Sequence, residues 1–346
     1  MTAKVDIRKS STEDLKSFLK SIGEKPFRAK QIEEWLWVKS AQSIDEMTNL
    51  SVKTRASLNK HFEIRPVTIA ERQVSNDKTI KYSFELGDKN KVEGVLIPVK
   101  DRITACISSQ VGCSLNCKFC ATGYMERMRN LDAAEIYDQV VRIKDEANEV
   151  YNKPLSNIVY MGMGEPLLNY KNVMESIEKV TSEKGLAMSP KRITVSTAGI
   201  AKMIKKLGDD DVKFNLALSL HAANDTKRNE IMPINDTNNL EVLKEALLYF
   251  HEKTGTRITF EYIAFDNFND SLEDAEELYQ FAKQIPSKVN IIEYNPIENA
   301  DYLNAGVDKI EAFQEYLEKK GIIVNVRRSR GKDIDAACGQ LAGKKK

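Results

Sequence analysis

Residues 106–120 contain four of the five cysteines, and this stretch constrains the chain more than any other. Cys113, Cys117 and Cys120 are spaced C-x3-C-x2-C, so one short loop can wrap three thiolates around a metal centre. Thiolates are soft ligands that favour iron–sulfur clusters, zinc or Cu(I). A closed site usually needs a fourth ligand, and no other cysteine or nearby histidine lies at ligand spacing. The residues alone leave open a zinc site or a chance group of buried thiols.

A three-cysteine loop with this spacing resembles the radical S-adenosylmethionine (SAM) superfamily. Three ligands leave one iron of a 4Fe–4S cluster open, and the resemblance implies that the amino and carboxylate groups of SAM chelate it. An electron from the cluster then cleaves SAM to a 5′-deoxyadenosyl radical. The resemblance therefore implies one 4Fe–4S cluster per chain, held by Cys113, Cys117 and Cys120.

The composition is that of an ordinary globular protein, large enough for a sizeable core. Of 346 residues, 42% are hydrophobic and 30% are charged, and the 52 basic and 51 acidic side chains nearly cancel. The net charge therefore neither supports nor excludes nucleic-acid binding, and the evidence has to come from local basic patches. We see neither a membrane-spanning apolar run nor a signal peptide, and the cysteines favour metal or redox chemistry over a disulfide framework. We expect a cytoplasmic protein.

Residues 1–60 predict a small helical domain. A capping sequence begins at Ser11, apolar residues follow at helical spacing up to Gly23, and the segments 27–38 and 48–61 predict two more helices. We expect this domain to assist RNA binding, although its basic side chains are equally consistent with a solvated helix face. These side chains are Lys25, Arg28, Lys30 and Lys39.

Residues 61–100 change to the alternating pattern of strands, at 64–72, 78–86 and 91–98. Turn residues at 76–77 and 87–88 separate the three segments. The pattern predicts a short antiparallel β extension that links the helical domain to the rest of the chain.

From 101 to 340, predicted strands and helices alternate, which indicates an α/β fold with a parallel sheet. The strands are expected at 103–108, 157–161, 192–197, 214–220, 257–265, 289–294 and 322–326. The helices are expected at 133–150, 170–183, 200–207, 240–253, 272–284 and 309–320. Six such units suit a partial barrel, open on one side, with ligands at the carboxyl ends of the strands. The chain ends in a basic tail, 341–346, and we expect its last four residues, 343–346, to be disordered.

Polar motifs follow four successive predicted strands at the edge where ligands are expected. Glycines let a ligand approach the backbone closely, and a carboxylate can pair with an ammonium or hydroxyl group. Singly, each motif is consistent with a plain turn, and a lone histidine is more often structural. Four together favour a site for a polar cofactor. The residues concerned are Gly164, Glu165, Ser196, Ser219, His221 and Asn295.

Six motifs, each ordinary alone, are jointly specific. They are the runs 108–113, 113–120, 161–167, 195–199, 218–221 and 337–340. Together they resemble the RlmN family, the bacterial dual-specificity radical SAM RNA methyltransferases, and the match includes the helical N-terminal domain. The resemblance implies a partial (β/α)6 radical SAM barrel and methylation of adenine at C2. The implied targets are one adenosine of 23S rRNA near the peptidyl-transferase centre and the adenosine 3′ of the anticodon in some tRNAs.

The resemblance also implies a role for individual residues. Cys338 would carry the methyl group, Cys106 would be its resolving partner, and Glu93 would be the proton acceptor. The SAM site would comprise Gly164, Glu165, Ser196, Ser219, Leu220, His221 and Asn295. An electron donor such as flavodoxin would reduce the cluster, and we expect a monomer without membrane attachment.

The chemistry explains why two further cysteines are needed. Adenine C2 lies between two ring nitrogens and is too electron-poor to attack the methyl group of SAM. The resemblance implies that one SAM methylates Cys338 and that the radical from a second SAM converts this methyl group to a methylene radical, which adds to C2. Cys106 then attacks the Cys338 sulfur, and the resulting disulfide frees the product. From the residues alone, Cys106 could equally be a buried strand residue and Cys338 a surface thiol.

The basic flank of Cys338, 327–332, favours a loop that enters an RNA-occupied site, and Arg127 and Arg129 are expected to contact phosphates. Two other functions remain open at this point. A sister family methylates adenine C8 with the same cluster and cysteine pair, and the residues do not separate C2 from C8. The alternative from another class is a non-catalytic RNA-binding protein with a structural zinc site.

Overall fold

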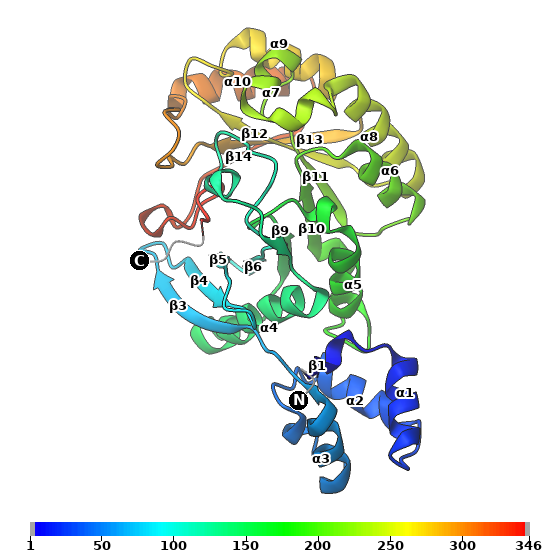
Figure 1. Ribbon diagram of the computed structural model, residues 1–346. Helices are drawn as coiled ribbons and strands as arrows, with labels where there is room; N and C mark the ends of the chain where they lie inside the picture. Colours follow the sequence, from blue (N-terminus) through cyan, green and yellow to red (C-terminus); the bar gives the residue numbers. More distant parts are fainter. Residues whose placement is uncertain (1–3, 343–346) are drawn as a thin grey trace.

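The computed structural model describes residues 4–342, and a ten-stranded sheet forms the centre of this part (Figure 1). Seven strands pair in parallel, in the order in which they occur along the sequence. They are β6 (Arg102–Cys106), β9 (Asn157–Tyr160), β10 (Ile193–Thr197), β11 (Asn215–Ser219), β12 (Ile258–Ala264), β13 (Ser287–Glu293) and β14 (Val324–Arg327). The connecting helices are α4 (Ala133–Tyr151), α5 (Tyr170–Thr181), α6 (Ala201–Asp209), α7 (Asp225–Ile231), α8 (Leu240–Thr254), α9 (Leu272–Ala282) and α10 (Val307–Lys319). The predicted partial barrel of alternating strands and helices is confirmed.

Burial on both faces explains the apolar strands, and capping residues explain where the helices begin and end. All seven residues of β12 are buried, as expected for a strand covered on both sides. Helix α4 begins with a capping box in which Asp132 and Glu135 each accept a hydrogen bond from the other's backbone N–H. Helix α8 ends at Gly255, whose φ of 66° a glycine adopts without strain.

The antiparallel strands extend the same sheet. Strand β5 (Lys91–Val99) pairs antiparallel with β6, and β4 (Ile80–Glu85) and β3 (Thr68–Val74) follow in turn. The turns at 76–77 and 87–88 lie between the strands, as predicted. Because β5 and β6 are neighbours, residues near the middle of β5 lie beside the strand that carries Cys106.

The N-terminal helices pack around their own apolar core at one end of the barrel (Figure 1). They are α1 (Thr12–Ser21), α2 (Arg28–Trp37) and α3 (Val52–His61), and a short parallel pair, β1 (Val5–Asp6) with β2 (Phe62–Glu63), closes the unit. Leu15, Leu19, Ile32 and Leu58 are buried within it. The aromatic ring of Trp37 contacts that of Tyr137 on α4, so this unit packs directly on the barrel.

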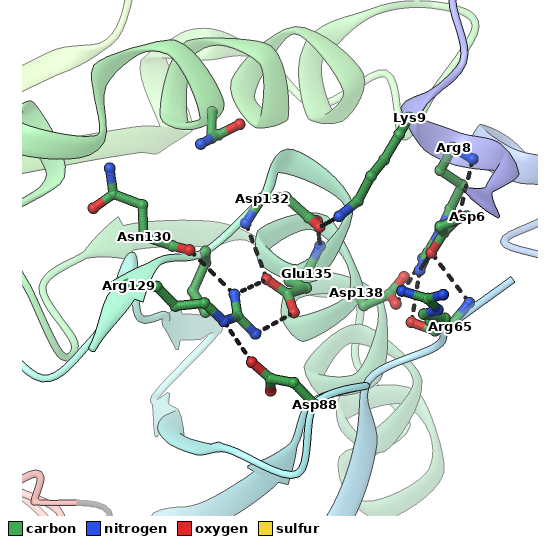
Figure 2. Close-up of polar contacts among 12 residues, drawn as sticks. Asp6, Arg8, Lys9, Arg65, Asp88, Arg129, Asn130, Asp132, Glu135 and Asp138 are labelled. Carbon is green, nitrogen blue, oxygen red and sulfur yellow. Dashed lines mark hydrogen bonds and ion pairs between the residues drawn. The ribbon is translucent and has the colours of Figure 1, made fainter. Parts of the chain in front are cut away.

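A buried group of charges joins the N-terminal helices to α4 (Figure 2). Arg8 Nη1 donates to Asp138 Oδ2 at 2.7 Å, and Arg8 Nη2 lies 2.8 Å from Asp6 Oδ2. Asp138 Oδ2 also accepts from the backbone N–H of Val67, and Asp6 Oδ2 accepts from that of Arg65. One guanidinium therefore pairs with two carboxylates inside the protein, and the pair with Asp138 joins residues 130 positions apart in the sequence.

The structure corrects the sequence prediction at two places around the barrel. The segment between 221 and 240 contains the unpredicted helix α7, and a short hairpin, β7 (Gln110–Val111) with β8 (Arg129–Asn130), frames the cysteine loop. The residues predicted to be disordered, 343–346, lie outside the described residues, and Leu341 at the start of the basic tail is buried. No helix within 4–342 has the length and apolar character that crossing a membrane requires.

Candidate active site

The cysteine loop lies across the open side of the barrel, and Cys113, Cys117 and Cys120 line one cavity. Burial and the negative charge of the neighbouring cysteines raise the pKa of the Cys117 thiol. The backbone packs tightly here, because a Cβ on Gly123 would lie 2.6 Å from the carbonyl oxygen of Cys117. The loop therefore brings all three thiols to the same cavity.

Five of the predicted SAM-site residues line this same cavity, at the carboxyl ends of β9, β10 and β11. They are Gly164, Glu165, Ser196, Ser219 and His221. Backbone N–H groups of Leu167 and Ala198 donate to the Glu165 carboxylate at 3.0 and 2.7 Å. Burial nevertheless raises the pKa of Glu165 to about 7, so a cationic group in the cavity would favour its ionised form.

His221 is a neutral imidazole held by the sheet. Its Nδ1 accepts from the backbone N–H of Ile263 at 3.1 Å, which leaves the proton on Nε2. Burial lowers the pKa of His221 to about 3, and its ring stands edge-on to Phe119 with 4.6 Å between ring centroids. The residue thus joins the cysteine loop to the end of β11.

Leu220 and Asn295 are not among the residues that line the cavity. Leu220 is fully buried in the apolar core. Asn295 Nδ2 donates to the carbonyl oxygen of Cys338 at 3.3 Å, whereas its buried Oδ1 has no hydrogen-bond partner among the described residues. Leaving a buried acceptor unpaired costs about 1–3 kcal/mol, so this oxygen suits an amino group supplied by a ligand.

A second cavity, of about 430 Å³, adjoins the first and contains both remaining cysteines. Cys106 lines only the second cavity, whereas Cys338 borders both. The two are free thiols. Burial raises the pKa of Cys106 to about 12. Cys338 is exposed as a residue, but loss of hydration around its sulfur raises its pKa, and the positive charge of Arg327 opposes that shift. The fold has brought together the two cysteines that the sequence places at opposite ends of the barrel.

Four arginines border the second cavity, and carboxylates pair with three of them. The arginines are Arg102, Arg327, Arg328 and Arg330. Arg327 lies 3.3 Å from Glu261 on β12, and Arg328 lies 2.8 Å from Glu293 on β13. The cavity that contains Cys106 therefore carries the basic character expected of a nucleic-acid site.

Glu93 lies outside both cavities. Its Oε2 accepts from the backbone N–H of Ala342 at 2.9 Å, and its Oε1 is 3.4 Å from Lys81 Nζ. Both side chains are buried, and Lys81 also donates to the carbonyl oxygen of Asp335. The C-terminal segment therefore covers the carboxylate, and its neighbour Leu341 lines the Cys106 cavity.

Arg129 has a structural task instead of the predicted phosphate contact. Its guanidinium pairs with Glu135 at 2.7 Å and with Asp88 at 2.6 Å, and thereby ties the hairpin after the cysteine loop to α4 and to the β4–β5 turn (Figure 2). Arg127, two residues earlier, is exposed.

The sequence analysis did not identify several buried charged residues around the cavities. They are Lys81, Arg228 and Glu261. A lone charged residue in a polar stretch normally indicates a solvated surface, and nothing in the local pattern distinguishes these three. Only the basic run 327–332 gave a signal, and it pointed to this region correctly.

The site residues fit a cluster and SAM. Among residues 4–342, no three Cys, His, Asp or Glu side chains converge where one metal ion could sit. Three thiols around a shared cavity instead suit a multi-iron cluster, in which each thiolate binds a different iron. A Cβ on Gly164 would lie 2.5 Å from the Gln110 side chain, so the close turn beside the cavity requires glycine. The unpaired Oδ1 of Asn295 offers an acceptor for an amino group.

Comparisons with known proteins identify the family. Residues 5–64 match the ribosomal RNA large subunit methyltransferase N-terminal domain, and residues 107–282 match the radical SAM superfamily. The chain is 67% identical to a probable dual-specificity RNA methyltransferase RlmN of Cytophaga hutchinsonii, over 97% of this chain and 92% of that protein. A protein of the same description from Christiangramia forsetii is 55% identical, over 99% and 97% of the two chains.

A solved structure agrees with this assignment. The crystal structure of a radical SAM methyltransferase from Sphaerobacter thermophilus matches with a TM-score of 0.92 and 38% identity, over 98% of this chain and 100% of that one. The predicted enzyme class is confirmed, and the family's cofactors are SAM and a 4Fe–4S cluster. The chain belongs to the RlmN family of radical SAM RNA methyltransferases.

Proposed function

We propose that this protein methylates C2 of one adenosine in 23S rRNA and of the adenosine 3′ of the anticodon in tRNAs. One observation carries the proposal: Cys338 borders both the cavity of the cysteine triplet and the arginine-lined cavity of Cys106. A sulfur in that position can receive a methyl group on one side and deliver it on the other.

The first cavity is the cofactor side. Cys113, Cys117 and Cys120 would hold the 4Fe–4S cluster, and the polar strand ends, with Leu220 behind them and Asn295 beside Cys338, would hold SAM. Cluster and SAM together supply the methyl group and the radical that the reaction requires. The carboxylate of Glu165 is suited to the ammonium group of SAM, because burial has already made an unpartnered negative charge unfavourable there.

The cysteine pair performs the transfer. Cys338 must lose its proton before it can accept a methyl group, and the neighbouring guanidinium of Arg327 favours the thiolate. Cys106 must also become a thiolate before it can attack the Cys338 sulfur. Burial opposes that step, so the attack requires a proton acceptor for the Cys106 thiol.

Glu93 is the proposed acceptor of the C2 proton. In the unbound protein the N–H of Ala342 covers its carboxylate, and Lys81 lies beside it. The ammonium group of Lys81, 3.4 Å from Oε1, would help to hold the carboxylate in place. Glu93 can reach the base only after Ala342 gives up its hydrogen bond.

The protein's partners are proposed from the same features. RNA would occupy the arginine-lined cavity, and the helical domain, residues 1–60, would help to hold the folded RNA. An electron donor such as flavodoxin would reduce the cluster, and the protein would act as a cytoplasmic monomer.

Nucleoside analysis tests the proposal directly. Ribosomal RNA and tRNA from a deletion strain and its parent would be digested and compared by mass spectrometry with 2-methyladenosine and 8-methyladenosine standards. We expect 2-methyladenosine to disappear from both RNAs and to return when the gene is restored. Loss of 8-methyladenosine would assign the sister activity instead, and unchanged nucleosides would contradict the proposal.

A further inference from the structure

Arg228 on α7 is completely buried, and its charge has no direct ionic partner. Its guanidinium donates only to neutral oxygens. They are the carbonyl of Leu220 (3.1 Å), the side-chain carbonyl of Asn235 (2.5 Å), and the carbonyls of Ala198 (2.7 Å) and Ser219 (3.2 Å). Among residues 4–342, no carboxylate lies within ion-pair distance. The nearest acidic residue, Asp225, accepts from the Asn235 amide instead.

Such an arrangement is costly unless something compensates the charge. Burying an ion costs several kcal/mol, and proteins normally pair buried charges. Hydrogen bonds to carbonyl groups satisfy the donors but leave the positive charge in place. Burial lowers the pKa of Arg228 to about 10, so the guanidinium is still charged near neutral pH.

The position of Arg228 indicates where the missing negative charge belongs. The side chain of Cys117 packs against the same apolar cluster as Ile231 of α7 and Ala198, and its thiol is the acidic group whose charge acts most strongly on Arg228. Helix α7 also contacts the cysteine loop directly, because the backbone N–H of Lys118 donates to the carbonyl of Ile231 at 3.0 Å. The carbonyls that Arg228 binds belong to the ends of β10 and β11, beside Ser196 and Ser219 in the cofactor cavity.

We propose that Arg228 is the built-in counter-charge of the cluster site and the positioning residue for the strand ends that hold SAM. The inference rests on the proposed ligand role of the cysteine triplet. Three thiolates bring negative charge into a buried site, and the guanidinium stabilises it. Reduction of the cluster adds one more electron, so a nearby positive charge favours the reduced form. Arg228 touches neither substrate nor cofactor through its donors, which all face the protein.

Two variants separate the charge from the hydrogen bonds. Arg228→Gln removes the charge but keeps an amide donor, whereas Arg228→Lys keeps the charge and loses the planar fork. Both would be purified anaerobically and assayed for iron and sulfide. The ratio of reduced to oxidised cluster would then be measured by electron paramagnetic resonance at a series of fixed potentials.

We expect Arg228→Gln to lower the reduced-to-oxidised ratio at least tenfold at fixed potential, which is about 59 mV for one electron. Arg228→Lys should change it much less. Arg8→Gln is the matched control, because Arg8 is also buried but is paired within the protein, and this variant should keep the wild-type ratio. A normal ratio in a fully loaded Arg228→Gln protein would overturn the proposal.

Failure to load the cluster is also informative. If Arg228→Gln binds no iron, Arg228→Lys should recover much of it, and equal loss in both variants would show that the charge is not what matters. The change in melting temperature on cluster loading gives a second readout, and we expect it to shrink in Arg228→Gln but not in Arg8→Gln. If the wild-type protein itself bound no cluster, the proposed function would fail, whatever the variants did.

Discussion

Two buried arginines, Arg8 and Arg228, have opposite surroundings. Arg8 lies between Asp6 and Asp138, where the N-terminal helices meet α4, and its charge is neutralised within the chain. Arg228 lies behind the cofactor cavity and is surrounded by neutral carbonyl oxygens. The first arrangement is complete when the chain has folded, whereas the second is complete only when negative charge is added beside it.

Unpaired polar atoms show the same contrast. Within residues 4–342, the buried side-chain atoms without a hydrogen-bond partner are Thr79 Oγ1, Tyr294 Oη, Asn295 Oδ1 and Arg330 Nε. None of them belongs to the N-terminal helices. Tyr294 and Asn295 follow β13, and Arg330 borders the Cys106 cavity. The helical domain satisfies its own polar groups, and the barrel leaves several for a ligand.

The largest effect is expected when the proposed negative partner of Arg228, the cysteine triplet with its cluster, is removed. Changing Cys113, Cys117 or Cys120 to Ala should abolish cluster binding and all methylation, because the C-x3-C-x2-C loop supplies just these three thiolates to the cavity. Iron and sulfide analysis under nitrogen, with a nucleoside assay, measures both effects. Full iron content and activity in any one variant would rule that cysteine out as a ligand.

The next prediction separates the two cysteines of the second cavity. Cys338→Ala should give neither product nor RNA adduct, since it has no methyl carrier. Cys106→Ala should still add the methylene group to adenine but should fail to release it, because a disulfide forms only through thiolate attack. Protein covalently joined to RNA should then accumulate on a denaturing gel.

Both cysteine variants should keep the cluster, which distinguishes them from the triplet variants. Absence of the crosslink with Cys106→Ala, or an equal crosslink with Cys338→Ala, would contradict the assignment. A double variant should behave like Cys338→Ala, because no adduct can form without the carrier.

Removing the charge of Arg8 from the buried group with Asp6 and Asp138 should lower the stability of the fold. It should leave the redox chemistry of the cluster unchanged. Arg8→Met leaves the buried carboxylates of Asp6 and Asp138 without their cationic partner, and removing one member of a buried pair costs about 3–5 kcal/mol. Urea unfolding of the metal-free protein measures the change. Lys16→Met is the control, since Lys16 pairs with Glu13 on the surface and should matter by less than about 1 kcal/mol. Equal effects of the two changes would show that the buried group is not a special contributor.

The smallest effect is expected from removing the charge of Glu293, whose two basic partners, Arg328 and Lys332, are exposed to solvent. Although burial opposes it, hydrogen bonds from Arg328 and Lys332 lower the pKa of Glu293 to about 2. A carboxyl group whose pKa is lowered in the folded protein stabilises the fold at pH values above its pKa in the unfolded chain, which is near 4.5. This contribution is lost as the pH falls toward 2. Because both basic partners are exposed, Glu293→Gln should cost less than about 1 kcal/mol. The difference from wild type should be present at pH 6.5 and shrink at pH 3; a difference that grows on acidification would refute it.

Local pattern was sufficient to predict much of this protein. Strand and helix periodicity located the barrel, Ser11 and Gly23 marked the ends of a helix, and the C-x3-C-x2-C spacing located the thiols. Helix α7 was missed because it is short and polar, with buried residues only at Arg228 and Ile231. Its arginine could not be recognised from sequence, since its partners come from strand ends that only the fold assembles.

Long-range pairing accounts for the other misses. Arg8 and Asp138 are 130 positions apart, and Ala342 meets Glu93 across 249 positions. Periodicity describes neighbours along a helix or strand and carries no information about such contacts. The role of Arg129 was mistaken for the same reason, because its carboxylate partner Asp88 belongs to a distant turn.

The hydrogen bond between Ala342 and Glu93 also bears on the timing of the reaction. Cys338 and Ala342 are only four residues apart, and Ala121 N–H holds the carbonyl of the intervening Gly339 at 2.7 Å. A displacement that carries the Cys338 sulfur toward RNA would also pull on Ala342, whose backbone N–H covers the Glu93 carboxylate. We therefore expect the methylene carbon on Cys338 to reach the adenine in the same step that exposes the Glu93 carboxylate. Before RNA binds, the Glu93 carboxylate would stay covered. Hydrogen exchange of the Ala342 amide should then accelerate when RNA binds, and unchanged exchange would show that the two motions are independent.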